Sequence, residues 1–216
     1  MIKPDFERDG IQLYCADCMD VLPHLSGVDA VVTDPPYGIG IASNPVRQAH
    51  EKMDWDESPP DASVIAAVSK ASKVSIIWGG NYFHLPATQC VLIWDKVQPE
   101  NFSLAMCEIA WTNLKKPSKI FQKRVVGYDK VHPTQKPVDL MEWCILQINQ
   151  EVETICDPFM GSGTTIVAAV KLGKRAIGIE RERKYFDIAV KRIERALSEE
   201  RSSLFPVSKE IQRELI

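Results

Sequence analysis

The chain has 216 residues, which predicts a single domain, and 45% of them are hydrophobic and 25% charged, which excludes a wholly disordered or fibrous protein. The 26 basic and 29 acidic residues give a net charge of −3, which excludes a uniformly basic nucleic-acid coat protein but not a local basic patch. No apolar run reaches the ~18 residues of a membrane-spanning helix, no apolar leader opens the chain, and six cysteines are too few for a disulfide scaffold. We therefore expect one cytoplasmic domain over residues 1–216.

Short apolar runs alternate with helix-like segments along the chain, which predicts an α/β fold with a largely parallel sheet. Several runs, such as Val74-Ser-Ile-Ile-Trp78, are nearly continuously apolar, as is typical of strands covered by helices on both faces. The expected strands are 12–15, 29–33, 74–78, 90–94, 106–112, 152–156 and 175–179, and the expected helices are 61–73, 137–147, 164–172 and 184–200. Two long segments, 38–60 and 113–131, show no periodicity. Because long loops in compact α/β proteins are often functional, we expect both to contact the substrate.

The expected strand at 29–33 ends in the run Asp34-Pro-Pro-Tyr37. Pro35 and Pro36 have no backbone donor and a fixed φ, so the run is rigid and offers free carbonyl oxygens. Asp34 and the Pro35 carbonyl can each accept one N–H of an exocyclic amino group, and Tyr37 can stack on the ring that carries it. A plain strand-ending turn is the alternative, because Asp and Pro are common in turns. The run favours a site for a flat amine.

The expected strand at 152–156 leads into the glycine loop Asp157-Pro-Phe-Met-Gly-Ser-Gly-Thr164 and then into a helix. Glycines allow close approach of a ligand, and a helix N-terminus offers amide donors. The loop is not a dinucleotide fingerprint, because Ile166 replaces the third glycine, and no lysine follows Gly163 as in a phosphate-binding loop. Glu180 ends the next strand, where an acid can hold two ribose hydroxyls. The pattern points to a ligand that contains a ribose.

The Asp-Pro-Pro-Tyr run precedes the glycine loop in this chain, and in this order the two motifs resemble those of the β-type, permuted amino-methyltransferases of DNA. The resemblance runs from about residue 12 to residue 195. His132-Pro-Thr-Gln-Lys-Pro137 is similar to the motif that closes the cofactor pocket in that family, and Asp17 keeps the acid of a Gly-Asp pair whose glycine is replaced by Ala16. The resemblance implies a Rossmann-like class I methyltransferase fold. Its sheet would be mostly parallel and seven-stranded, with helices on both faces, strands 152–156 and 29–33 adjacent, and a circularly permuted motif order.

The resemblance also implies roles for individual residues. S-adenosyl-L-methionine would lie over the loop 157–164, with its methyl group aimed at Asp34. The implied catalytic residues are Asp34, Pro35, Pro36 and Tyr37. The implied cofactor ligands are Glu180 at the ribose, Asp17 at the adenine amino group, Phe159 against the adenosine, His132, Thr134 and Lys136 at the methionine end, and Asp157, Gly161, Gly163 and Thr164 of the loop.

The activity implied is that of a site-specific, adenine-specific DNA methyltransferase, because Asp before Pro-Pro-Tyr usually accompanies adenine N6 in this family and Ser accompanies cytosine N4. A base in a duplex must be flipped out before it reacts. Hydrogen bonds from its amino group to Asp34 and the Pro35 carbonyl favour a localised lone pair, which attacks the methyl group in line without a covalent enzyme intermediate. Cytosine N4 methylation and a catalytically silent DNA-binding partner subunit remain alternatives. The missing third glycine disfavours a nucleotide-dependent oxidoreductase.

Double-stranded DNA is the implied partner, and one segment is suited to its phosphates. Six basic residues stand against the single acid Asp129 between positions 115 and 130: Lys115, Lys116, Lys119, Lys123, Arg124 and Lys130. A solvated loop is the alternative. No metal site is expected, because Cys15-x-x-Cys18 has no second pair at a suitable spacing. The sequence leaves open a homodimer, a cognate restriction endonuclease, and whether the host is a prokaryote or a phage.

Overall fold

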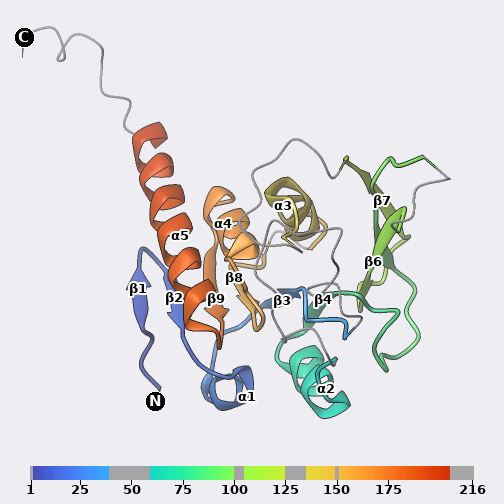
Figure 1. Ribbon diagram of the computed structural model, residues 1–216, viewed down its shortest axis with the longest axis horizontal. Helices are drawn as coiled ribbons and strands as arrows, with labels where there is room; N and C mark the ends of the chain where they lie inside the picture. Colours follow the sequence, from blue (N-terminus) through green and yellow to red (C-terminus); the bar gives the residue numbers. More distant parts are fainter. Residues whose placement is uncertain (1, 39–58, 100–104, 125–134, 149–150, 205–216) are drawn as a thin grey trace, which may run out of the picture.

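The computed structural model describes residues 2–38, 59–99, 105–124, 135–148 and 151–204, and within these ranges a single nine-stranded sheet carries helices on both faces (Figure 1). The strands are β1 (Phe6–Arg8), β2 (Ile11–Tyr14), β3 (Ala30–Thr33), β4 (Val74–Trp78), β5 (Val91–Asp95), β6 (Cys107–Thr112), β7 (Lys119–Gln122), β8 (Thr154–Asp157) and β9 (Arg175–Ile179). The helices are α1 (Cys18–Val21), the 3₁₀ helix η1 (Leu22–His24), α2 (Ala62–Lys70), α3 (Val138–Leu146), α4 (Thr164–Lys171) and α5 (Arg183–Leu204).

The strand order in the sheet is β1-β2-β9-β8-β3-β4-β6-β5-β7. The neighbours from β2 to β4 all pair in parallel, β6 runs antiparallel between β4 and β5, and β1 and β7 form the two edges. Each of the seven expected strands is present, which confirms the mostly parallel sheet. The expected number of strands was wrong, because two short edge strands complete the sheet. One of them, β7, lies inside the segment 113–131 that the sequence presented as a loop.

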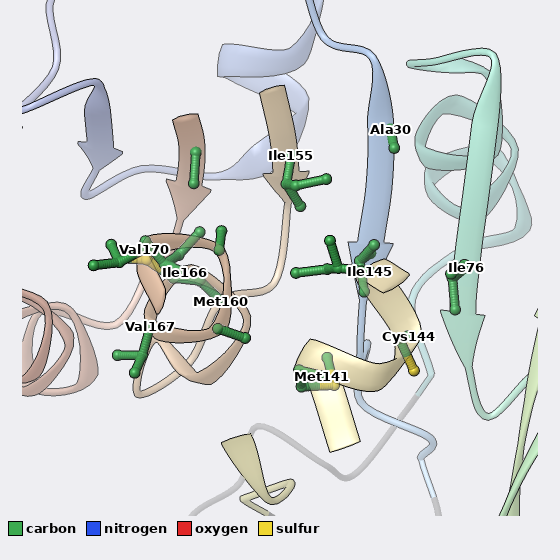
Figure 2. Close-up of a cluster of buried hydrophobic side chains, with 14 of the residues drawn as sticks. Ala30, Ile76, Met141, Cys144, Ile145, Ile155, Met160, Ile166, Val167 and Val170 are labelled. Carbon is green, nitrogen blue, oxygen red and sulfur yellow. The ribbon is translucent and has the colours of Figure 1, made fainter. Parts of the chain in front are cut away.

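The helices form two layers, with α1 and α2 on one face of the sheet and α3, α4 and α5 on the other (Figure 1). Helix α4 is buried from Thr164 to Val170 because it lies between α3 and α5 as well as on the sheet. Figure 2 shows α4, which carries Ile166, Val167 and Val170, next to α3, which carries Met141 and Ile145, with Ile155 of β8 above the two helices. Full burial of one such side chain contributes about 1.5–3 kcal/mol, so this layer is a rigid support for the loop that precedes α4.

The two motif-bearing strands are neighbours at the centre of the sheet. Residues Ala30 and Val31 of β3 pair in parallel with Ile155 and Cys156 of β8, which confirms the expected adjacency. From β3 the chain continues through α2 to β4 on one side, and from β8 it continues through α4 to β9 on the other. The connecting helices lie on opposite faces of the sheet (Figure 1). The carboxyl ends of two such strands border a crevice, which is where open α/β sheets bind their ligands.

The helix bounds differ from the expected ones mainly at the ends. Helix α5 begins one residue earlier and continues to Leu204, four residues past the expected end, while the four-residue α1 and the short η1 are additions. Within the described ranges, no helix combines the length and the hydropathy that crossing a bilayer requires.

Candidate active site and cofactor pocket

A cavity of about 380 Å³ lies at the carboxyl ends of β3 and β8. This volume is within the range of small-molecule sites. Nine of the residues singled out in the sequence line it: Asp17, Asp34, Pro36, Lys136, Asp157, Phe159, Gly161, Thr164 and Glu180. The fold therefore brings the acid after β2, the Asp-Pro-Pro-Tyr run and the glycine loop to one cavity.

The remaining catalytic and cofactor-binding candidates fall into two groups. Pro35, Tyr37 and Gly163 belong to the described part of the chain but are not among the residues that line the cavity. His132 and Thr134 lie outside the described residues.

The loop before α4 is shaped by its two glycines, which serve different purposes. Gly161 has φ +52° and nothing within 4 Å of the position that a Cβ would occupy, and its N–H donates to Glu180 Oε2 at 3.0 Å. Gly163 has φ +81°, and a Cβ there would lie 3.0 Å from the Cβ of Ala189 in α5. Gly161 thus leaves space on the cavity side, whereas Gly163 allows the close approach of α5. The expected contact of Gly163 with the cofactor stays a prediction.

The carboxylate of Glu180 is held by backbone donors at the rim of the cavity. Its Oε1 accepts from the N–H of Glu182 at 2.7 Å, and its Oε2 accepts from Gly161. Burial raises the pKa of Glu180 to about 7, although both backbone hydrogen bonds oppose the rise. Glu180 is therefore poised to change its charge near neutral pH.

Asp157 links the two central strands. The Thr33 hydroxyl donates to Asp157 Oδ1 at 2.6 Å, and the N–H of Phe159 donates to the same oxygen at 3.1 Å. Burial raises the pKa of Asp157 to about 6, and the hydrogen bonds with Thr165 and Thr33 oppose this rise. The carboxylate therefore fixes the start of the glycine loop against the end of β3.

Arg192 of α5 binds the same glycine loop through hydrogen bonds to Ser162 and Thr164. Its Nη1 donates to the carbonyl oxygen of Ser162 at 2.5 Å, to Ser162 Oγ at 2.8 Å and to Thr164 Oγ1 at 3.3 Å. Arg192 was not among the site residues predicted from the sequence. Its signal was a charged residue on the apolar stripe of α5, next to the buried Ile193. A charge in such a position needs a polar partner.

Asp34 is the centre of a second group of polar side chains. Its Oδ2 accepts from Lys136 Nζ at 2.6 Å, and its Oδ1 accepts from the Tyr37 hydroxyl at 2.7 Å. Lys136 was expected at the methionine end of the cofactor. It does line the cavity, but its ammonium group pairs with Asp34 and, at 2.9 Å, with Glu108 Oε2. Burial raises the pKa of Asp34, and the Lys136 ammonium group opposes the rise.

Glu108 in β6 and Lys96 after β5 complete this group, and neither was among the site residues predicted from the sequence. Lys96 Nζ lies 2.6 Å from Glu108 Oε1, and the Tyr37 hydroxyl lies 3.3 Å from Glu108 Oε2. Burial alone would raise the pKa of Glu108, but the ammonium groups of Lys136 and Lys96 hold it at about 2. The available signal was a single glutamate inside an otherwise apolar strand, because a buried charge requires a partner of opposite sign.

The Tyr37 ring is fixed by residues after β4. It stacks on Tyr82 with ring centroids 5.0 Å apart, and it lies so close to Gly79 that a Cβ there would be 2.2 Å from Tyr37 Cε1. Burial, followed by the charges of Asp34 and Glu108, keeps the pKa of Tyr37 well above its ordinary value, so its hydroxyl is a donor. One face of the ring expected to stack on a base is covered by Tyr82.

The basic segment is divided between solvent and the protein. Lys115, Lys119 and Arg124 are exposed. Lys116 donates to the carbonyl of Gln147 after α3, and Lys123 pairs with Asp139 of α3 at 2.5 Å. The sixth member, Lys130, lies outside the described residues.

Comparison with known proteins identifies the family. A family model for DNA methylase, of the N6 and N4 type, matches residues 70–191, which is more than half of the chain. Type II methyltransferase M2.LlaDCHI of Lactococcus lactis subsp. cremoris is 50% identical, over 89% of this chain and 93% of its own. Type II methyltransferase M2.MboI of Moraxella bovis is 29% identical, over 88% of this chain and 91% of its own.

Solved structures agree with these relatives. The chain is similar to M1.HpyAVI in its complex with SAM, with a TM-score of 0.58 and 26% identity over 85% of this chain and 98% of that one. The PvuII DNA methyltransferase, which is cytosine-N4-specific, superposes with a TM-score of 0.62 at 15% identity, over 88% of both chains, and supports the fold alone.

The cavity fits S-adenosyl-L-methionine by its own chemistry. The carboxylate of Glu180 suits two ribose hydroxyls, Phe159 offers an aromatic surface, and the open side of Gly161 leaves room for a ligand at the start of α4. These features agree with the expected cofactor, and the relatives and solved structures agree with the expected fold and DNA substrate. The chain belongs to the family of N6-adenine and N4-cytosine DNA methyltransferases that use S-adenosyl-L-methionine.

Proposed function

We propose that this methyltransferase modifies N6 of adenine and that Asp34 and the carbonyl of Pro35 accept hydrogen bonds from the two N–H groups of the target amine. The observation that carries this proposal is the position of Asp34, at the end of β3, in the same cavity as Glu180 and Gly161. The choice of adenine is supported by Asp34 itself, since the resemblance associates aspartate at this position with adenine and serine with cytosine.

Asp34 retains the capacity to bind a substrate amine. An ionised carboxylate has about four acceptor positions, and the Tyr37 hydroxyl and the Lys136 ammonium group occupy two of them. A flipped adenine can therefore donate one N–H to Asp34 and the other to the Pro35 carbonyl. This arrangement localises the lone pair of the nitrogen outside the ring and orients it toward the methyl donor, which supplies a methyl group on a positively charged sulfur.

Methyl transfer then needs no covalent bond to the protein. The amino nitrogen forms its bond to the methyl carbon as the bond from that carbon to sulfur breaks. The nitrogen becomes positively charged and releases one proton, which Asp34 is placed to receive. The protein contributes orientation and electrostatic stabilisation of the developing positive charge.

The cofactor residues divide by chemistry. We propose that Glu180 binds the ribose hydroxyls, that Phe159 packs on the adenosine, and that Asp17 accepts the adenine amino group. Asp17 already accepts from the N–H of Met19 through Oδ1, which leaves Oδ2 for a ligand. We call the place of the target amino group, at Asp34 and the Pro35 carbonyl, the amine site. We assign Lys136 to this amine site instead of the methionine end of the cofactor, because its ammonium group lies between Asp34 and Glu108.

Transfer of a radiolabelled methyl group to unmethylated DNA tests the proposal. Asp34→Asn keeps the shape of the side chain but replaces one acceptor oxygen by an NH2 donor. We therefore expect the methyl-transfer rate to fall at least 100-fold, while the affinity for S-adenosyl-L-methionine, measured by calorimetry, stays unchanged. Digestion of the product to nucleosides should yield N6-methyladenosine, whereas N4-methylcytidine would overturn the choice of base. Near-normal transfer by Asp34→Asn would overturn the role of Asp34.

We further propose that residues 1–216 act as one methyltransferase domain whose segments 38–60 and 113–131 contact DNA. The relatives are named Type II methyltransferases, which supports a role beside a restriction endonuclease of the same specificity. Single-molecule sequencing of DNA from cells that express the chain would locate the target site. Light scattering with and without a DNA duplex would decide between a monomer and a homodimer.

A further inference from the structure

Four charged side chains meet behind the amine site, and together they carry no net charge. Lys136 lies 2.6 Å from Asp34 and 2.9 Å from Glu108, and Lys96 lies 2.6 Å from Glu108. The two lysine side chains are only 5% and 8% exposed, and the two carboxylates are about one-fifth exposed. Such groups are stable in a protein interior only as partners, because each isolated charge would have a large desolvation cost.

Glu108 contacts both lysines of this group and the Tyr37 hydroxyl. Its Oε1 binds Lys96, and its Oε2 faces both Lys136 and the Tyr37 hydroxyl, which are the two groups that also bind Asp34. Glu108 itself is not among the residues that line the cavity. It can therefore act on the substrate only through Lys136 and Tyr37.

The Lys136 ammonium group pairs with two carboxylates, and this affects how well Asp34 can accept a hydrogen bond from the substrate. If Lys136 faced Asp34 alone, its ammonium group would be drawn further onto the oxygen that the substrate amine needs. If Lys136 were absent, Asp34 and Glu108 would be like charges in one buried site, and one of them would take up a proton. Either change would weaken Asp34 as an acceptor, but the two changes act on its protonation in opposite directions.

We propose that Glu108 is a positioning residue for methyl transfer, which shares the Lys136 ammonium group with Asp34 and so keeps Asp34 available to the target amine, while Lys136 keeps Asp34 ionised. This inference rests on the proposed role of Asp34 as the acceptor. Other groups near Asp34 are the Tyr37 hydroxyl and the Asp157 carboxyl of β8, and Lys136 also faces the Cys144 thiol of α3. None of these is altered in the variants below.

The test is the pH dependence of the single-turnover methyl-transfer rate, at saturating S-adenosyl-L-methionine, between pH 5 and 9. The acidic limb of this profile reports the group that must be ionised in the complex. In Lys136→Met we expect the limb to move up by about one pH unit or more, because Asp34 loses its ammonium partner and stays close to Glu108, which keeps its own partner Lys96. In Glu108→Gln we expect it to move down, while the plateau rate falls about tenfold because Lys136 is left to Asp34 alone.

The double variant Glu108→Gln/Lys136→Met removes both effects. Its acidic limb should lie at least half a pH unit below that of Lys136→Met, which amounts to a partial rescue at neutral pH. Loss of packing alone cannot move two single variants in opposite directions and then reverse one of them. If Lys136→Met proves unfolded by circular dichroism, Glu108→Gln decides, because its limb must still move down.

Glu142→Gln is the matched control. Glu142 of α3 also pairs with a lysine, Lys171 at 3.4 Å, and its exposure is similar to that of Glu108, but it is not among the residues that line the cavity. Its profile should be that of the wild type. Unmoved limbs in both single variants, together with an inactive Asp34→Asn, would overturn the role of Glu108 and leave the proposed function intact. An active Asp34→Asn would overturn both.

Discussion

The backbone of Gly79 lies directly against the ring of Tyr37, so that a Cβ at position 79 would be 2.2 Å from Cε1 and 2.5 Å from Cδ1 of that ring. Tyr37 donates its hydroxyl to Asp34, and Gly79 directly follows β4 with φ +71°. The turn after β4 therefore sets the position of a side chain that follows β3. This contact makes Gly79 a determinant of the amine site although it has no side chain.

Gly79→Ala should reduce the single-turnover rate by roughly 10- to 100-fold, because a displaced Tyr37 no longer holds Asp34 in place. The overlap should also cost about 1–3 kcal/mol of stability in urea unfolding. Gly27→Ala is a matched control, since Gly27 has φ +72° but nothing within 4 Å of its would-be Cβ. It bears the same left-handed strain without the overlap. Equal rates in the two variants would show that Tyr37 tolerates the displacement.

The parts of the site predicted from the sequence are those that end apolar strands. Asp34 follows β3 and Asp157 ends β8, both of which are buried along their whole length, and the parallel sheet brings such ends together without further information. The segments beyond the sheet centre were harder. β1 and β7 have three and four residues, too few for an alternating pattern to stand out, and the burial of β7 is slight on both faces.

The charged group behind Asp34 could not be predicted in the same way. Glu108 and Lys136 are 28 positions apart and meet only because β6 is inserted antiparallel between β4 and β5. No local pattern specifies that pairing. The sequence did contain a partial signal, because Glu108 interrupts an apolar strand, and a buried charge predicts an unnamed partner.

Cofactor binding should depend on pH through Glu180. Its pKa of about 7 is above the ordinary value, so the carboxylate that accepts the ribose hydroxyls is present mainly above neutrality. If only the ionised form binds, the affinity for S-adenosyl-L-methionine should rise about tenfold between pH 6 and pH 8. Calorimetry at the two values tests this.

The same raised pKa has a consequence for folding stability. The folded protein holds the Glu180 proton more tightly than the unfolded chain does, so this group's contribution to stability is greatest below the unfolded pKa and is lost as the pH rises toward about 7.

Two variants control the binding experiment. The Glu180→Gln variant should bind S-adenosyl-L-methionine weakly and with no pH dependence, and the variant Glu153→Gln, at an exposed position, should bind it like the wild type. A wild-type affinity that is constant from pH 6 to 8 would remove Glu180 from ribose binding.

Arg192 should support cofactor binding through the glycine loop. Arg192→Met leaves the carbonyl and hydroxyl oxygens of Ser162 without their donor, and both Ser162 and Thr164 line the cavity. We expect the dissociation constant for S-adenosyl-L-methionine to rise roughly tenfold, consistent with the loss of hydrogen bonds to a charged group. Arg192→Lys should restore part of the affinity.

Arg195→Met is the control for this substitution, because Arg195 lies one turn further along α5 and pairs with Glu199 on the exposed surface. Such a pair contributes less than about 1 kcal/mol, so neither affinity nor stability should change much. If Arg192→Met unfolds at lower urea concentration but binds the cofactor normally, Arg192 only joins α5 to the loop.

The exposed part of the basic segment should carry the contacts to DNA phosphates. Lys115, Lys119 and Arg124 are exposed, whereas Lys116 and Lys123 are engaged with Gln147 and Asp139. Each phosphate contact that is removed lowers the slope of log K against log salt by about 1. We therefore expect the triple variant Lys115→Ala/Lys119→Ala/Arg124→Ala to lower the slope by roughly 2–3 and to weaken binding equally for all sequences.

The double variant Lys116→Ala/Lys123→Ala is the control, and it should instead reduce stability with a smaller change in slope. Fluorescence anisotropy with a labelled duplex between 50 and 200 mM salt (about the range in which such contacts are measured) provides both slopes. An unchanged slope in the triple variant would place the DNA on another face. If these three side chains contacted phosphates, their removal would have to reduce counterion release and so lower the slope.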